Sequence, residues 1–75
     1  MDAGTLIHSE QLDIRGRRYE VAVFQRANGS HVARTVFAPG DVIMNDGPSL
    51  EAVLAKHQRL LPLAIDSREL RAESS

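Results

Sequence analysis

The sequence predicts an α+β fold in which one helix covers one face of an antiparallel sheet. Two runs with alternating hydrophobic and polar residues, 19–26 and 31–38, flank Asn28-Gly29, a dipeptide typical of the turn between paired strands. Hydrophobic residues then recur at helical spacing from Leu50 to Leu61. Because each pattern has one hydrophobic face, the sheet and the helix are expected to pack on each other.

The first strand is expected at residues 6–14, joined by a turn at Arg15-Gly16 to a second strand at residues 17–26. A two-residue turn places Asp13 opposite Arg18. Opposite charges across a strand pair favour this register.

A two-residue turn at Asn28-Gly29 would place Val23 opposite Arg34 and Val21 opposite Val36. The resulting core face holds Leu12, Ile14, Tyr19, Val21, Val23, Val32 and Val36. The outer face then holds Asp13, Arg18, Glu20, Ala22, Phe24, Arg26, His31, Ala33, Thr35 and Phe37. A shift by one residue would exchange these faces.

The third strand is expected to end at Pro39-Gly40, and residues 42–44 form either a short fourth strand or an extended connection. The sheet therefore has three or four strands. Ser49 is a suitable N-cap for the helix. We expect the helix to end near Leu61, because Pro62 disfavours helical geometry at the preceding residue.

Seventy-five residues indicate one small domain, expected at 1–67 with a flexible tail at 68–75. The chain has no Cys, and nine basic residues stand against ten acidic ones. A thin core without disulfides favours self-association, so a homodimer is expected. No signal-peptide pattern or membrane-spanning stretch is visible, and we expect a cytoplasmic protein.

Residues 19–65 resemble the HicB-like antitoxin domain. The resemblance depends on Tyr19-Glu20-Val21-Ala22-Val23, on Gly29, on Phe37-Ala38-Pro39-Gly40, and on Asp46-Gly47-Pro48-Ser49-Leu50-Glu51-Ala52. It implies a sheet covered by one helix, in a protein that binds and neutralises a small RNase toxin. The connection between Gly40 and Gly47 is longer than usual for that family, and a C-terminal DNA-binding domain is not expected. Operator binding is therefore not implied.

Three histidines are candidate metal ligands. His8 and His31 are expected on opposite faces of the sheet, and His57 at the edge of the helix's hydrophobic stripe. This arrangement favours a packed His57 ring over a metal site, so no metal ligand is predicted.

Motifs for catalysis are missing from the sequence. There is no Gly-x-Ser-x-Gly elbow and no glycine-rich loop that would hold a phosphate before a helix. Gly47-Pro48-Ser49 favours helix capping over anion binding. We expect no enzyme, no catalytic residue and no cofactor.

Arginines and aromatic residues are the candidate binding groups. The outer face would present Arg18, Phe24, Arg26 and Phe37 to another protein or to a second copy of the chain. Alternatively, Arg15, Arg17, Arg18 and Arg26 would bind RNA or single-stranded DNA. The net charge of −1 favours a protein partner.

Arg34 conflicts with the expected pattern, because it would project from the core face. Either its side chain extends beyond the helix to reach water, or it pairs with Glu10 or a partner.

Overall fold

A computed structural model describes residues 4–74, so predictions for residues 1–3 and 75 lie outside the described residues. An antiparallel sheet with strand order β1-β2-β3-β4 precedes one helix. The elements are β1 (Thr5–Ile14), β2 (Arg17–Gln25), β3 (His31–Ala38), β4 (Asp41–Gly47) and α1 (Leu50–Ser74). The α+β prediction is confirmed, and residues 42–44 belong to a fourth strand.

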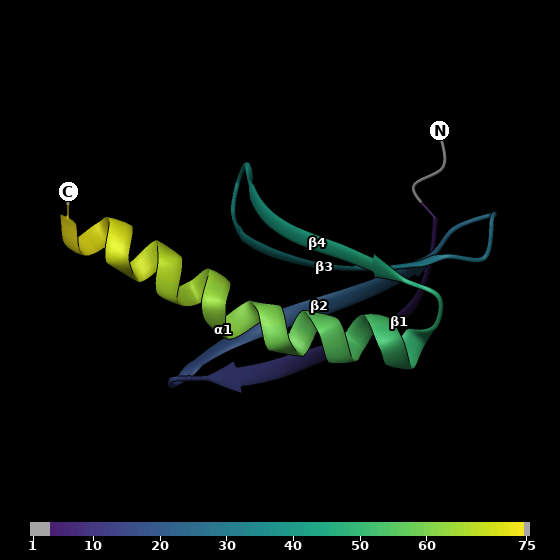
Figure 1. Ribbon diagram of the computed structural model, residues 1–75, viewed down its shortest axis with the longest axis horizontal. Helices are drawn as coiled ribbons and strands as arrows, with labels where there is room; N and C mark the ends of the chain where they lie inside the picture. Colours follow the sequence, from purple (N-terminus) through teal and green to yellow (C-terminus); the bar gives the residue numbers. More distant parts are fainter. Residues whose placement is uncertain (1–3, 75) are drawn as a thin grey trace.

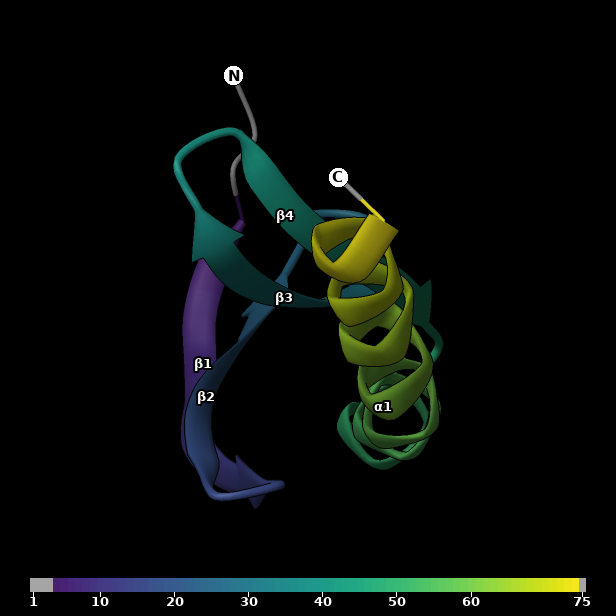
Figure 2. The same cartoon turned by 90° about the vertical axis from the view of Figure 1, so that its left-hand side faces the viewer.

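The sheet is strongly curved, and α1 lies on its concave side (Figures 1 and 2). The helix packs mainly against β4 and β3, whereas β1 pairs with β2 at the far edge of the sheet. We call the concave side the inner face and the opposite side the outer face.

The β1–β2 hairpin has the predicted register. Arg15 and Gly16 have φ values of 53° and 79°, as a two-residue type I′ turn requires. Asp13 lies opposite Arg18, whose Nε donates a 3.3 Å hydrogen bond to the Asp13 carboxylate. A register shift between Leu6 and His8 marks a bulge near the start of β1.

The β2–β3 hairpin differs from the prediction by one residue. Arg26 N donates to Ser30 O and Gly29 N donates to Arg26 O, both at 2.9 Å, which closes a three-residue loop. Gly29 has a φ of 89°, whereas Asn28 is not left-handed, so the turn is not type I′. Val23 consequently pairs with Ala33 instead of Arg34.

The extra loop residue reverses the predicted faces of β3. Thr35 and Phe37 point inward, whereas Arg34 and Val36 point outward. Val36 is 56 % exposed, so its prediction as a core residue is wrong. Val32 is buried, but it lies on the outer face opposite Phe24.

The core lies between β2, β3 and α1. Its buried members are Val21, Val23, Ala33, Val53 and Leu61, with Leu12, Ile14, Phe37, Ile43, Leu50 and Leu54 packed partly buried against them. The helix contributes a buried stripe at every fourth residue: Val53, His57, Leu61 and Ile65. Of the predicted core-face residues, Leu12, Ile14, Val21 and Val23 lie in this cluster, whereas Val32 and Val36 lie on the outer face.

The helix starts as predicted and ends later than predicted. Ala52 N donates to Ser49 Oγ at 3.1 Å, which confirms the N-cap. The helix then continues through Pro62 to Ser74, so the predicted end at Leu61 is wrong and residues 68–74 are helical. Its axis bends near the middle (Figure 1), as expected where a proline cannot donate a backbone hydrogen bond.

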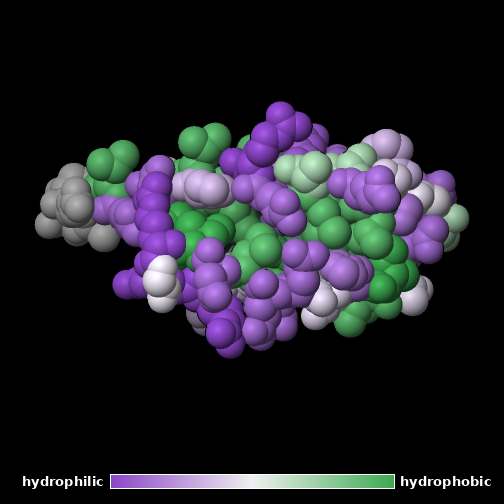
Figure 3. Space-filling view, turned by 90° about the horizontal axis from the view of Figure 1, so that it is seen from below, coloured by the Kyte–Doolittle hydropathy of each residue, from purple (hydrophilic) through white to green (hydrophobic). Residues whose placement is uncertain are grey.

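Hydrophobic side chains reach the surface on the side shown in Figure 3, as a band between hydrophilic ones. One helix is therefore not wide enough to cover the inner face of the sheet completely. Within residues 4–74, no helix is both long and apolar enough to cross a membrane.

Candidate functional site

The outer face of the sheet carries an apolar surface, which we call the outer-face patch. Its members are Leu6, Phe24, Val36, Val42 and Met44. Leu6 pairs with Phe24, and Val36 pairs with Val42, so side chains of all four strands contribute. Leu6, Val36 and Met44 are each more than half exposed. Exposed apolar patches of this kind mark interaction sites.

Arg34 lies in the middle of this patch. Its guanidinium carbon is 4.8 Å from the centroid of the Phe24 ring, within cation–π range. The predicted core-face position of Arg34 is therefore wrong, because the register places it outside. The alternative pairing with Glu10 is also wrong, since Glu10 on the inner face accepts a 2.7 Å hydrogen bond from His8.

Charges on the outer face balance one another. The cations are Arg18, Arg26 and Arg34, and the anions are Asp13, Glu20 and Asp46. Arg18 pairs with Asp13. Arg26 lines a shallow hollow together with Val32 and Asp46. The face is thus apolar and nearly neutral.

Phe37 is separated from the other predicted partner-binding residues. Arg18, Phe24 and Arg26 lie on the outer face as predicted, but Phe37 faces inward. Its ring meets the Tyr19 ring edge-on, with centroids 5.8 Å apart. The prediction that Phe24 and Phe37 share one face is therefore wrong, for the same reason as at Val36.

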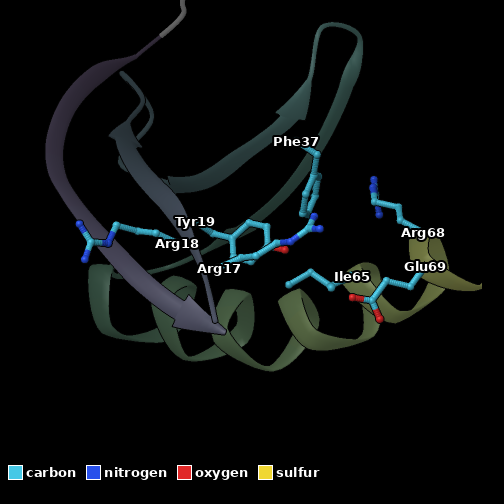
Figure 4. A pocket seen from close by; sticks show the side chains of 7 residues that line it. All are labelled: Arg17, Arg18, Tyr19, Phe37, Ile65, Arg68 and Glu69. Atoms are coloured by element: carbon cyan, nitrogen blue, oxygen red, sulfur yellow. The ribbon is translucent and has the colours of Figure 1, made fainter. Parts of the chain in front are cut away.

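Phe37 instead helps to form a cleft of about 360 Å³ between the sheet and the second half of α1, which we call the inner cleft. Its lining residues are Arg17, Arg18, Tyr19, Phe37, Ile65, Arg68 and Glu69 (Figure 4). Arg17 points between Tyr19 and Phe37, whereas Arg18 points away.

Two sets of ion pairs hold the walls of this cleft together. Arg68 donates to both carboxylate oxygens of Asp41, at 2.9 and 2.6 Å, and to the Ala64 carbonyl at 2.9 Å. Its guanidinium also lies 4.1 Å from the Phe37 ring centroid. These hydrogen bonds with Asp41 raise the pKa of Arg68.

At the β1–β2 turn, Arg15 pairs with Asp66 and lies 3.4 Å from Glu69. The helix beyond Pro62 is thus tied to the β1–β2 turn and to the start of β4.

The four arginines predicted to bind nucleic acid do not converge. Arg15 pairs with acidic residues of α1, and Arg17 points into the inner cleft. Arg18 pairs with Asp13 on the outer face, and Arg26 lies at the β2–β3 loop. The structure therefore does not bring them together into one cationic surface.

His57 is fully buried, not at the edge of the core as predicted. Asn45 Nδ2 donates to the Val53 carbonyl at 3.1 Å, which turns Asn45 Oδ1 toward His57 Nδ1. His57 Nδ1 therefore donates to Asn45, and Nε2 accepts a 2.7 Å hydrogen bond from the Thr35 hydroxyl. Burial lowers the pKa of His57 and favours the neutral ring.

The other two histidines share the inner face, contrary to the prediction of opposite faces. The bulge in β1 places His8 opposite Val23. His31 lies two residues before Ala33 in β3 and therefore on the same inner face. His31 Nδ1 is buried without a hydrogen-bond partner in the described chain. Within residues 4–74, no three His, Asp or Glu side chains lie close enough together to hold a metal ion.

Sequence reasoning missed the exposed members of the outer-face patch and the role of Arg68. The signal for the patch was the charge of Arg34, which is incompatible with the core face assigned to it. Comparison with protein-family models, curated proteins and solved structures gives no match to this chain.

Proposed function

We propose that this protein is a small non-enzymatic interaction module that associates with a second copy of itself through the outer-face patch. The observation that carries the proposal is the uncovered apolar sheet face, with Val36 56 % and Met44 55 % exposed. Packing two such faces together would form a sheet-on-sheet core and remove both from water.

The size of the face supports a weak dimer. Seven residues of β4 extend over roughly 23 Å, and four strands over roughly 19 Å, which gives a projected area of about 450 Å² for this convex face. Two copies would bury about 900 Å² before side-chain relief is counted, which is below the roughly 1,200 Å² of stable interfaces and in the range of weak, transient ones. We therefore expect a reversible dimer with micromolar affinity.

Charge supports a second copy over a nucleic acid. Three cations and three anions share the outer face, so two copies can meet without net repulsion. Arg34 and Phe24 form the centre, and aromatic and Arg side chains are enriched at protein interfaces. A nucleic acid would require a cationic excess, and its proposed ligands Arg15 and Arg17 lie elsewhere.

A second exposed apolar surface lies on the helix and competes with this proposal. Leu63 and Leu70 are each 66 % exposed and lie two turns apart on one side of α1. This stripe is narrower than the outer-face patch, and Lys56 and Arg59 flank the cavity beside it. It therefore offers less apolar area to a partner.

Sedimentation equilibrium of the wild type and two charged variants tests the proposal. Val36→Glu places a carboxylate in the outer-face patch, and Leu63→Glu makes the same change on the exposed side of the helix. We expect dimers for the wild type and Leu63→Glu, and monomers for Val36→Glu. A monomeric wild type at about 100 μM, far above the expected dissociation constant, would refute self-association. Loss of the dimer only in Leu63→Glu would place the interface on the helix.

The resemblance to the HicB-like antitoxin domain stays a prediction. A sheet covered by one helix is what that resemblance implies, and toxin binding would be a second use of the same outer face. Co-expression with a small RNase toxin tests it: rescue of growth, lost in Val36→Glu, would support it. Unchanged toxicity on co-expression would refute the prediction that the chain neutralises such a toxin.

A further inference from the structure

We propose that the inner cleft binds a carboxylate that carries a hydrophobic group, held by the Arg17 guanidinium against the wall formed by Phe37 and Ile65. This cleft opens on the inner side of the molecule, so the proposal is independent of self-association through the outer-face patch.

Arg17 is the group that would hold the carboxylate. It is on the same face of β2 as Tyr19, and its guanidinium points into the cleft (Figure 4). Its side chain forms no ion pair or hydrogen bond with any described residue between positions 4 and 74. A guanidinium presents parallel donors that match the two oxygens of a carboxylate.

The other charges around the cleft are already engaged. Arg68 is held by Asp41 and the Ala64 carbonyl, so it keeps the Phe37 ring in place instead of taking up the ligand. The Glu69 carboxylate lies beside Arg15, which offsets its repulsion of an anion. Among the described residues, Arg17 is therefore the cleft arginine that forms no ion pair or hydrogen bond.

The hydrophobic wall sets the second requirement. The Phe37 ring meets the Tyr19 ring edge-on, and the buried Ile65 side chain lines the cleft from α1. A volume of about 360 Å³ accommodates one ring or a branched alkyl group with its carboxylate. Such a group occurs in a free hydrophobic acid and at the C-terminal residue of a peptide.

Titrations monitored by amide NMR test the chemistry with three small probes. 3-Phenylpropionate carries both the ring and the charge, its amide lacks the charge, and acetate lacks the ring. We expect 3-phenylpropionate to saturate in the low millimolar range, as is usual for a ligand of its size. The shifts should be confined to the cleft, at Arg17, Tyr19, Phe37 and Ile65, and the other two probes should bind at least about tenfold more weakly.

The matched variants are Arg17→Gln and Arg59→Gln, which each remove one exposed arginine that forms no ion pair or hydrogen bond within the described residues. Arg17→Gln should weaken 3-phenylpropionate binding at least about tenfold, and Arg17→Lys should do so less, because Lys keeps the charge but lacks the planar fork. Arg59→Gln should leave binding unchanged. An acetylated peptide that ends in Phe distinguishes the sources: tighter binding than 3-phenylpropionate indicates a polypeptide C-terminus, and weaker binding indicates a free acid.

Equal binding of the acid and its amide, equal binding by Arg17→Gln and wild type, or shifts outside the cleft would each overturn the proposal. Unchanged amide spectra of the free variants would show that both remain folded. Failure here leaves the dimer proposal intact, because sedimentation tests the opposite face of the sheet.

Discussion

Thr35 and Val36 are neighbours in β3 with opposite environments. Thr35 is 1 % exposed and donates to His57, whereas Val36 is 56 % exposed on the outer face. Thr35→Val should cost about 1–3 kcal/mol of unfolding free energy, because it leaves the buried His57 nitrogen without a partner. Val36→Thr, the reverse change one residue away, should alter stability by less than about 0.5 kcal/mol. Urea unfolding of the two variants measures this difference. The opposite ranking would support the register that a two-residue turn gives, with Val36 in the core.

His57 makes stability dependent on pH. Its pKa is lowered in the folded protein, so below the ordinary value of 6.5 the unfolded chain binds a proton that the folded chain does not. The contribution of the neutral His57 ring to the free energy of unfolding should therefore be complete above pH 6.5. It should decrease as pH falls below 6.5, by up to about 1.4 kcal/mol per pH unit.

Urea unfolding at several pH values between 7.5 and 5.5 measures this pH dependence. The range is chosen because a histidine in the unfolded chain titrates near pH 6.5. His57→Gln should flatten the dependence. The same slope in wild type and His57→Gln would contradict the role given to His57.

The helix α1 is held beyond Pro62 by contacts that are distant in sequence. Arg68 bonds to Asp41 through two nitrogens and stacks on Phe37. Arg68→Gln should lower unfolding free energy by about 1–2 kcal/mol and increase amide hydrogen exchange in residues 66–74. Arg59→Gln serves as the control, because Arg59 is exposed on the helix. Unchanged exchange in Arg68→Gln would show that the second half of the helix does not depend on this anchor.

The same helix also provides a test of the buried stripe. Leu61 is fully buried and Leu63 is 66 % exposed, two residues apart on either side of Pro62. Leu61→Ala should cost about 2–5 kcal/mol through lost burial and a residual cavity. Leu63→Ala should change stability by less than about 0.5 kcal/mol. Thermal unfolding compares them, and similar losses would mean that the helix is rotated relative to the sheet.

Local signals explain which parts of these elements could be predicted. The strand β3, the Arg15-Gly16 turn and the Ser49 cap depend on residues near one another in the sequence. The length of the Asn28-Gly29 loop could not be predicted, because the dipeptide fits both a two-residue and a three-residue loop. The continuation past Pro62 depends on the Arg68–Asp41 and Arg15–Asp66 pairs, which no local pattern reveals.

At the scale of the whole molecule, one sheet and one helix leave two surfaces unfilled. The helix packs on β3 and β4, so no described element covers the outer-face patch and the inner cleft stays open toward β2. Of the predicted binding residues, Phe24 remains in the patch, and Phe37 moves to the cleft because the register shifts by one residue. The cleft itself could not be predicted, because the sequence predicts a helix that ends near Leu61 and a flexible tail from residue 68, which includes Arg68.

Amide NMR spectra recorded over a dilution series test the proposed self-association most directly, because they report both the association and its location. We expect concentration-dependent shifts centred on Arg34, Val36 and Met44, with the exposed side of α1 around Leu63 unchanged. The shifts should fit a reversible monomer–dimer equilibrium and be absent in Val36→Glu. Spectra that do not change with concentration, or shifts confined to the helix, would contradict an interface at the outer face of the sheet.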